Sequence, residues 1–481
     1  MVGIKVLIVA GLLALLVMLV AAAADHAAAA AAAASAIGDS AQRRRNIAAR
    51  RMESLAASFA AAKPPSSSQT GNLEASGSRV YHVTEYGADP TGVADSTSAI
   101  ARAIADAFRP PTSRTLLSGI PDLGGAEVDL DGGVYVLTSP LSLPASGGGN
   151  FKIHSGSLRA SDNFPTDRYL IELWASGSSS SSLYEFITLS GLMLDSNFRG
   201  GGVAVVNAIR TTIDNCYITH FTTDGIWVQN GHETFIRNSF LGQHITVGND
   251  PGEKNFTGTG IKLMGNDNAV TDVVVFSAAT GILVSGEANT LTGVHCYNKA
   301  TGWGGTGIYL KTPGLSQTRI TNCYLDYTGI VSEDPVLVHI SSSFFLGDAN
   351  VVLKSINGVV KGVNIVDNMF SGTGAGVDIV RLDGGFTTVE QVIVDRNVAD
   401  GMTVRSTVAK ASVAGNASTW TADFSPVLLF PDRIGHVQYS LLADSAFPYH
   451  ALRNTSGNQV VVESNVVVPA TVHVAVDQSG G

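Results

Sequence analysis

The chain has 481 residues, of which 45% are hydrophobic and only 15% are charged, and it contains 52 glycines. This composition is typical of many short strands joined by tight turns and excludes a helical bundle. The formal net charge of −10 argues against a nucleic-acid-binding protein, and an anionic substrate would need a local basic cleft.

The first 24 residues have the pattern of a signal peptide. Lys5 supplies a positive start, residues 6–20 form an apolar run, and the alanines at 21–24 are small enough for cleavage. The alternative is an uncleaved anchor, because the apolar run is nearly long enough to span a bilayer. We expect a secreted, extracellular protein that has no membrane attachment once the signal is removed.

Three Asn-X-Ser/Thr sequons agree with this secretory route as glycosylation sites. Their asparagines are Asn255, Asn416 and Asn454. The cysteines are too few for a disulfide scaffold, and their odd number leaves at least one unpaired. We expect Cys216, Cys296 and Cys323 to be buried as small apolar side chains.

Residues 25–78 are expected to form an arm or linker, because an alanine run, an arginine-rich stretch and a Pro-Pro-Ser-Ser-Ser breaker follow one another. Order should begin at about residue 79 with a strand over 80–83. Asp95 is then expected to cap a helix whose apolar residues Ile100, Ile104 and Phe108 lie on one face. Such a helix can cover the open end of a solenoid.

From about residue 120 the chain repeats. One set of short strands begins at Leu189, Ile213, Ile236, Ile320 and Ile340, and the longest gap holds two less regular copies. Those two copies lie at Val270 and Leu291. Strands that open with Gly-Ile follow many of them, at residues 225, 260, 281 and 307. Outside the longest gap, the strands of the first set recur every 20–24 residues. Short strands with a period of this length are the signature of a β-solenoid.

We therefore predict an all-β fold, a parallel β-helix with an N-terminal capping helix and a small C-terminal β unit. Coils stacked at about 4.8 Å pair their backbones and bury their inward side chains in one core. The predicted parts are a signal peptide (1–24), an arm or linker (25–78), the β-helix (79–402) and a β-rich cap (403–481). A polar ladder in the turns is expected from Asn215, Asn238, Asn322 and Asn368.

Two stretches resemble a known family. The run Tyr-Gly-Ala-Asp-Pro-Thr-Gly at 86–92, followed by Asp-Ser-Thr at 95–97, resembles the opening of plant polygalacturonases and other pectin-lyase-like β-helices. Residues 222–226, Thr-Thr-Asp-Gly-Ile, are similar to the family's Asn-Thr-Asp-Gly-Ile motif. The chain most resembles the divergent QUARTET-type branch. The resemblance implies a right-handed β-helix that hydrolyses galacturonan with inversion, and it places one catalytic carboxylate on Asp224.

The chain also departs from the family's pattern. The Asp pair expected one coil later is missing before Gly260, although the inserted Gly-Asn-Asp could supply Asp250 from another direction. The histidine of the Gly-His-Gly element is absent near Thr280. The final Arg-Ile-Lys-Thr falls on residues 309–312, where Lys311 matches and Tyr309 replaces the arginine.

Hydrolysis needs an acid that protonates the leaving oxygen and a base that activates water, about 6.5–9.5 Å apart in an inverting enzyme. Asp224 is the first candidate. Asp195 or Asp250 is a candidate for the second carboxylate, and His244 for orienting one of them. Each of these four residues also has a plain structural interpretation, as a turn aspartate or an exposed histidine.

Four further side chains are candidates for substrate binding. Arg199, Lys262 and Lys311 can pair with uronate carboxylates, and Tyr309 can stack on a sugar ring. The two lysines are expected at the same register on neighbouring strands. No metal or other cofactor is expected. The expected partner is a pectic polysaccharide, and the chain is expected to act as a monomer in the plant cell wall.

Two other functions stay open at this point. A pectate-lyase-like β-eliminase would need a calcium-binding carboxylate cluster and a basic proton abstractor, and no dense Asp cluster is visible. A non-catalytic pectin-binding β-helix would explain the missing Asp pair and histidine.

Overall fold

The computed structural model describes residues 79–117, 119–174, 183–244, 257–297, 305–443 and 447–480. The predicted signal peptide and arm, together with Asp250 and Asn255, lie outside these described residues. No helix in the described part of the chain has the length and apolar character needed to cross a membrane.

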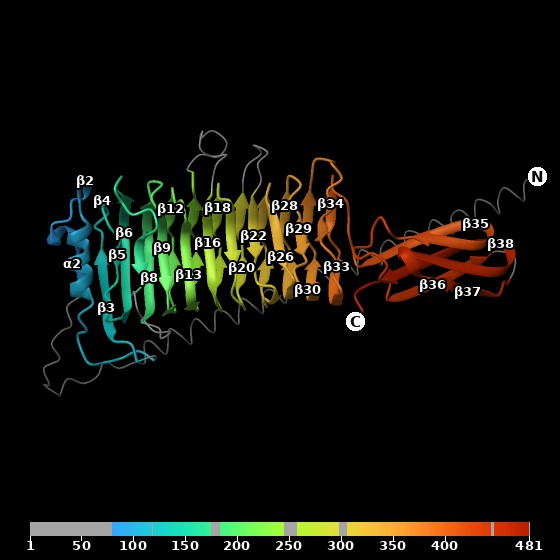
Figure 1. The fold of residues 1–481 in the computed structure, drawn as a ribbon, viewed down its shortest axis with the longest axis horizontal. Helices are drawn as coiled ribbons and strands as arrows, with labels where there is room; N and C mark the ends of the chain where they lie inside the picture. The colour runs from blue at the N-terminus through green and yellow to red at the C-terminus, as the bar shows by residue number, and fades with distance from the viewer. Residues whose placement is uncertain are drawn as a thin grey trace, which may run out of the picture. The chain divides into compact units, whose positions relative to one another are not determined.

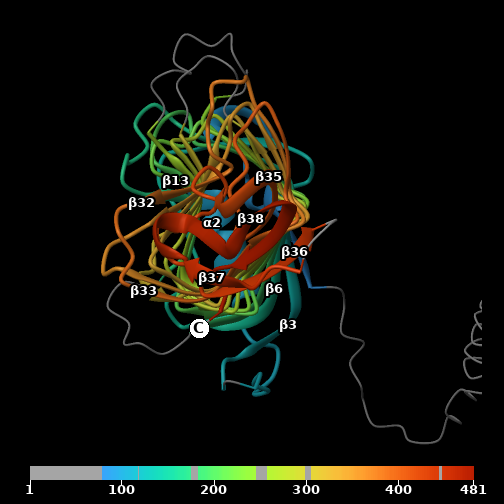
Figure 2. The ribbon, with the colours of Figure 1, turned by 90° about the vertical axis from the view of Figure 1, so that its right-hand side faces the viewer.

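The predicted fold class is confirmed. Within the described residues, strands β1–β34 pair in parallel and form one continuous sheet that winds into a β-helix (Figure 1). A view along the stack shows the coils superimposed on one another (Figure 2). Each regular coil crosses three strand positions, which we name faces A, B and C, with a sharp corner after each.

Each face is a row of strands that stack coil upon coil. Face A contains β5 (Leu141–Ser142), β7 (Tyr169–Leu173), β9 (Gly201–Val206), β13 (Asp224–His232), β16 (Thr259–Asn266), β19 (Thr280–Val284), β22 (Thr306–Leu310), β26 (Gly329–Glu333), β29 (Val351–Lys354) and β32 (Val380–Asp383). Face B contains β1 (Val80–His82), β3 (Asp122–Asp129), the first halves of β6 (Gly148–Ala160) and β8 (Tyr184–Asp195), β11 (Thr212–Asp214), β14 (Phe235–Arg237), β17 (Ala269–Thr271), β20 (Thr290–Thr292), β24 (Arg319–Thr321), β27 (Pro335–Ser341), β30 (Val359–Val366) and β33 (Thr388–Asp395).

Face C completes the coil. It contains β2 (Thr91–Asp95), β4 (Val134–Leu137), the second halves of β6 and β8, β12 (Tyr217–Thr219), β15 (Phe240–Gly242), β18 (Val274–Phe276), β21 (His295–Tyr297), β25 (Tyr324–Asp326), β28 (Phe344–Leu346), β31 (Met369–Ser371) and β34 (Val398–Asp400). Two short strands, β10 (Ala208–Ile209) and β23 (Gly314–Leu315), lie beside the corners.

The core consists of inward side chains that stack in rows. On face A, Ile226 pairs with Ile261, Ile261 with Ile282, and Ile282 with Ile308, and all four are fully buried. The irregular copies at Val270 and Leu291 also stay in register on face B, as expected. Each fully buried side chain of this kind contributes about 1.5–3 kcal/mol.

A row of glycines explains the recurring Gly-Ile pattern on face A. A Cβ added to Gly225, Gly260 or Gly281 would lie 2.5–2.6 Å from the carbonyl oxygen of the glycine one coil further on. No real Cβ makes so close a contact with a backbone oxygen, so the stacked backbones exclude any side chain here. The glycine therefore fixes where each face A strand begins.

The prediction of a polar ladder of asparagines in the turns is only partly confirmed. Asn215, Asn238 and Asn322 occupy equivalent corner positions between faces B and C, each with φ between 50° and 55°. Asn368 lies one residue beyond that position and is buried, where its side-chain amide donates to Asn397 Oδ1 at 3.0 Å. A short polar side chain favours the left-handed conformation at such corners.

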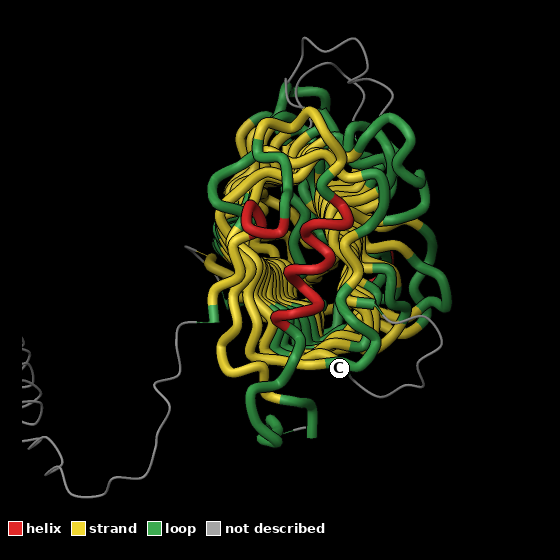
Figure 3. The backbone as a smooth tube through the Cα atoms, turned by 90° about the vertical axis from the view of Figure 1, so that its left-hand side faces the viewer, coloured by secondary structure: helices red, strands yellow, loops and turns green. Residues whose placement is uncertain are grey.

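Helix α2 (Thr97–Ala107) covers the N-terminal end of the β-helix, as predicted (Figure 3). Its residues Ile100 and Ile104 and the following Phe108 are buried. The helix begins one residue later than expected, with Ser96 at the N-cap, while Asp95 accepts a hydrogen bond from Thr97 N at 3.1 Å. The only other helical segments among the described residues are the 3-10 turns η1 (Val83–Tyr86) and η3 (Ser456–Asn458).

The family-like opening motif has a structural role at this end. The Asp89 carboxylate accepts hydrogen bonds from the backbone of Thr91, Val93 and Ala94 and therefore closes the loop before the helix. These hydrogen bonds lower the pKa of Asp89 below its ordinary value. Gly87 ends η1 with φ of 84°.

The C-terminal segment forms the predicted β unit, and its strands are antiparallel. It contains β35 (Val408–Asp423), β36 (His436–Ala443), β37 (His450–Asn454) and β38 (Gln459–Asp477), and β38 pairs with the other three. Trp420, Val460 and Val462 lie in its own apolar core. Buried and more exposed residues alternate along most of β38, as expected for a strand with one face toward a core.

The three cysteines are free and buried, as expected. Burial raises the pKa of Cys216 and of Cys323 to about 11 and raises that of Cys296 as well. They therefore act as small apolar side chains of the core.

Candidate active site

Asp224 lies at the first position of β13 on face A. It directly precedes the glycine row, so its height in the stack is fixed by Gly225. Only 8% of the residue is exposed, which is unusual for a carboxylate. A buried acid of this kind needs hydrogen-bond or charge partners.

The first partner is Tyr169, two coils earlier on the same face. Its hydroxyl donates to Asp224 Oδ2 at 2.8 Å. The residue between them is Gly201, and a Cβ there would lie 2.4 Å from the Tyr169 ring and 2.5 Å from the Asp224 carbonyl oxygen. Gly201 therefore leaves the space through which Tyr169 reaches across an entire coil.

The second partner comes from the next coil. Lys262 Nζ lies 3.8 Å from Asp224 Oδ2, and Thr259, the register partner of Asp224, also hydrogen-bonds to the carboxylate. Burial raises the pKa of Asp224, and Lys262 and Tyr169 offset only part of that effect. A carboxyl group whose pKa is raised by burial is suited to act as a general acid.

An aromatic group lies beside this carboxylate. The Trp227 ring stacks on the Tyr169 ring at 5.7 Å and meets the edge of Trp174 at 6.0 Å. Lys262 Nζ lies 5.9 Å from the centre of the Trp227 ring. Trp174 is 36% exposed. Partly exposed indole rings next to an acid and a cation form a surface on which a sugar ring can stack.

The later coils carry hydroxyl groups in the Asp224 row. Thr259, Thr280 and Thr306 pair in register with one another and with Asp224. The row therefore contains one carboxylate and no histidine among its described members. The missing Asp pair before Gly260 and the missing histidine near Thr280 therefore fall at positions that stack in register on Asp224.

Asp195 lies on face C, at the end of β8, and has partners of its own. His220 Nδ1 is 2.7 Å from its Oδ1, Asn197 N donates to the same oxygen at 2.9 Å, and Arg159 Nε is 3.6 Å from Oδ2. Burial alone would raise the pKa of Asp195, but the hydrogen bonds from His220 and Asn197 outweigh it and lower the pKa. Asp195 is therefore held as a carboxylate.

His244 lies near the Asp195 group. It is buried, and its ring is 5.4 Å from that of Phe198, which also lies 4.7 Å from the His220 ring. The Phe198 ring thus packs against both histidine rings. The described partners of Asp224 itself are Tyr169, Lys262 and Thr259, which lie on face A.

A second cluster lies three coils beyond Trp227 on face A. The Tyr309 hydroxyl donates to Glu333 Oε1 at 2.6 Å, and Lys354 Nζ lies 3.1 Å from the same oxygen. The expected register of the two lysines was wrong. Lys262 pairs with Leu283 and thereby lines up with Tyr309, whereas Lys311 follows the end of β22 and is exposed.

The remaining candidates are spread over other parts of the surface. Arg199 directs its Nε to the carbonyl oxygen of Phe164 at 2.9 Å, so this donor is used within the fold. Asn416 and Asn454 are exposed on β35 and β37 of the C-terminal unit. Exposure is what a glycosylation site requires.

The most important residues that the sequence did not indicate are Tyr169, Trp174 and Trp227. Tyr169 and Asp224 are 55 residues apart and become neighbours only through the coil register. Trp227 follows the recognised motif directly, so a test of outward positions in that strand would have found it. His220, which is not among the four catalytic candidates named from the sequence, is in contact with Asp195.

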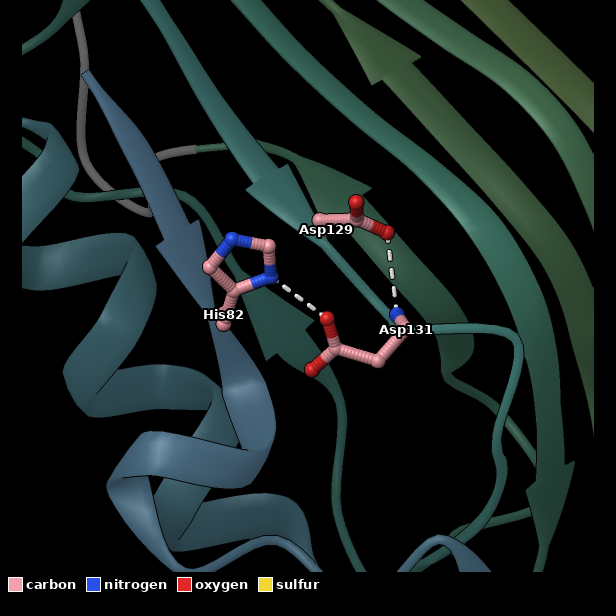
Figure 4. A group of neighbouring side chains, drawn as sticks. All are labelled: His82, Asp129 and Asp131. Carbon is pink, nitrogen blue, oxygen red and sulfur yellow. Dashed lines mark hydrogen bonds and ion pairs between the residues drawn. The ribbon is translucent and has the colours of Figure 1, made fainter. Parts of the chain in front are cut away.

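One group of the described residues has the spacing of metal ligands. Ligand atoms of His82, Asp129 and Asp131 lie within 4.8 Å of one another (Figure 4). His82 Nδ1 is 2.5 Å from Asp131 Oδ1, and Thr84 Oγ1 donates to the other oxygen at 2.7 Å. These bonds tie the first two coils together, which is a sufficient structural role for the group.

The chain has a strong relative among known proteins. No family model matches the chain. Polygalacturonase QRT3 of Arabidopsis thaliana is 57% identical over 408 residues, which cover 84% of this chain and 85% of the relative. The solved structure of ORF18 of Geobacillus virus E2 aligns with a TM-score of 0.51 at 12% identity and covers 81% of this chain and 77% of its own. Endo-xylogalacturonan hydrolase from Aspergillus tubingensis aligns with a TM-score of 0.44 at 13% identity, over 68% and 95% of the two chains.

The likeness to the ORF18 structure shows the fold alone, because the sequence identity is only 12%. The Arabidopsis relative is different, since its identity is high across more than four-fifths of both chains. Together with the β-helix and the motif around Asp224, it confirms the resemblance drawn from the sequence. The chain belongs to the polygalacturonase family of glycoside hydrolases and is a plant member of the QUARTET type.

Proposed function

We propose that this protein is a secreted polygalacturonase that hydrolyses homogalacturonan in the plant cell wall by an inverting acid/base mechanism. The observation that carries the proposal is Asp224, a buried carboxyl group with a raised pKa that is hydrogen-bonded to Tyr169 and close to Lys262. The family supplies the substrate class, and the aromatic rings and lysines of face A suit an anionic sugar chain.

The acid and base roles follow from the two environments. Asp224 is the general acid, because burial favours its protonated form. Asp195 is the base, because His220 and Asn197 favour its ionised form. Two carboxyl groups whose surroundings push their pKa values apart are the usual mark of an acid/base pair. His220 positions the base, and His244 supports it through Phe198.

Substrate binding is assigned to the outer surface of face A. Trp227 and Trp174 provide ring faces for stacking, and Lys262 pairs with a uronate carboxylate next to the acid. Three coils beyond Trp227, Lys311 and the Tyr309 cluster bind the continuing polysaccharide chain. The distance of about 4.8 Å between coils is comparable with the length of one sugar unit.

The first experiment measures the products from de-esterified polygalacturonate. A hydrolase releases reducing ends without the ultraviolet absorbance of unsaturated sugars. Absorbing products would identify a lyase, and binding without either product would identify a non-catalytic pectin-binding protein. Both results would refute the proposal.

The second experiment tests the named acid. Asp224→Asn should lower kcat by about 10²–10⁴-fold, the usual range for loss of a general acid. Asp214→Asn is the matched control, because Asp214 is a β-helix aspartate that pairs with Arg237 on face B. The melting temperature of Asp224→Asn at neutral pH should not fall, because the substitution removes a charge that is costly to bury. Full activity of Asp224→Asn would exclude Asp224 as the acid.

A further inference from the structure

Face B carries an open groove that the proposed active site does not use. The groove has a volume of about 760 Å³ and extends over β20, β24, β27 and β30. Its floor includes Thr290, Arg319, His339 and Asn364, which pair in register across successive coils. Asp224, in contrast, begins a strand of face A.

Arg319 is the distinctive residue of this groove. It is exposed, and across the described ranges no hydrogen bond or ion pair is found for its guanidinium group. Other cations on the same face have carboxylate partners. Lys152 pairs with Glu127 at 3.3 Å, Arg237 with Asp214 at 3.3 Å and Lys361 with Glu390 at 2.7 Å. Arg319 is therefore available to a ligand.

The rest of the lining suits a sugar acid. None of the residues described as lining the groove is acidic, although the protein as a whole carries a net charge of −10. Thr292 and Thr321 stack one above the other, with 3.2 Å between their hydroxyl oxygens, and they offer polar groups at the spacing of the coils. Hydroxyl groups and one guanidinium can bind the hydroxyls and the carboxylate of a uronic acid.

One wall of the groove is apolar. Leu337 lies within β27, has a φ of 58° and is 46% exposed. Its partner in the next coil is Gly362, where a Cβ would lie 2.8 Å from Leu337 Cδ2. Gly362 therefore gives Leu337 room to lie along the groove, where it can contact the C–H face of a sugar ring.

We infer that this groove is a second, non-catalytic binding site for galacturonan, in which Arg319 pairs with a uronate carboxylate. The choice of galacturonan rests on the proposed function. The site would hold one stretch of a long polymer on face B while another stretch lies on face A. Short oligomers would occupy face A alone.

The test uses the full chain with Asp224→Asn, so that the polymer is not consumed. Its retardation in gels that contain polygalacturonate gives an apparent Kd. Adding Arg319→Gln should raise this Kd by about five- to tenfold, since tenfold corresponds to the loss of one charge-assisted hydrogen-bonded pair. Arg237→Gln, the matched control on face B, should change it less than about twofold, because Arg237 already has a partner.

Two further measurements separate the possible outcomes. In the active chain, Arg319→Gln should leave the rate on trigalacturonate unchanged. In gels that contain neutral dextran, it should have no effect. The inference is wrong if Arg319→Gln retains full affinity for polygalacturonate, or if it weakens binding to dextran equally. Failure of the proposed function would be seen separately, as the absence of reducing ends from the unmodified chain.

Discussion

Face A around Asp224 and face B around Arg319 are built on the same coils but differ in how their charged groups are held. Asp224 is buried and has contacts from coils on both sides, through Tyr169 and Lys262. Arg319 is exposed and has no described partner. Face A holds its ionisable group in a fixed position before any ligand arrives, and face B leaves its guanidinium group free.

This difference indicates what each face can do. Chemistry needs groups held in position and shielded from water, because their effect on a transition state depends on orientation and on a low local dielectric. Binding a flexible polymer needs only accessible partners at a regular spacing. Substitutions on face A should therefore change kcat and its pH dependence, whereas substitutions on face B should change only polymer affinity.

The largest effect beyond Asp224 itself is expected at Asp195. Asp195→Asn should lower kcat by about 10²–10⁴-fold, because a neutral amide cannot take a proton from water. Initial rates on polygalacturonate check this, with Asp162→Asn as a control aspartate whose described contact is with Asn197. Retention of more than half of the activity would move the role of base to another residue.

Lys262→Met should have the next largest effect. The apparent KM for polygalacturonate should rise about tenfold, because a uronate loses its cation. The substitution also removes the charge that most favours ionised Asp224, so the pKa of that acid should rise. A change in kcat alone, with KM unchanged, would show that Lys262 does not contact the substrate.

Tyr169→Phe should mainly shift the pH profile. Activity requires protonated Asp224, so it is lost as the pH rises through the pKa of that group. The Tyr169 hydroxyl favours the ionised form, and its removal raises the pKa and moves the basic limb to higher pH. The profile of kcat/KM measures this, and Tyr184→Phe, a buried tyrosine whose hydroxyl contacts backbone carbonyls, is the control. An unchanged basic limb would mean that Asp224 is not the acid.

The smallest effect is expected on face B. Thr321→Val removes one hydroxyl from the stacked pair and should weaken polymer retention about twofold, without a change in kcat. The same gels that test Arg319 can measure it. A loss of kcat in Thr321→Val would break the comparison, because face B would then contribute to the chemistry.

The sequence predicted the scaffold better than the site, and the reason is physical. The rows through Ile226 and Ile213 repeat because each coil must bury the same inward positions, and such local patterns can be read directly. Asp224 was found because its motif is contiguous. Tyr169 and Trp174 were not found, because coils of unequal length bring Tyr169 beside Asp224 and Trp174 beside Trp227. Lys262 and Lys311 were misaligned for the same reason, since a shift of two residues cannot be seen without the paired strands.

The glycine row of face A has a consequence for how this enzyme can change. Because Gly225, Gly260 and Gly281 fix the start of each strand, the residue just before each glycine always emerges at the same place on the surface. Long insertions between coils leave these places where they are. Exchanging one side chain there, such as Thr259 or Thr280, can add or remove a functional group without altering the core. The scaffold thus keeps these surface positions constant, so that a catalytic set can change one residue at a time.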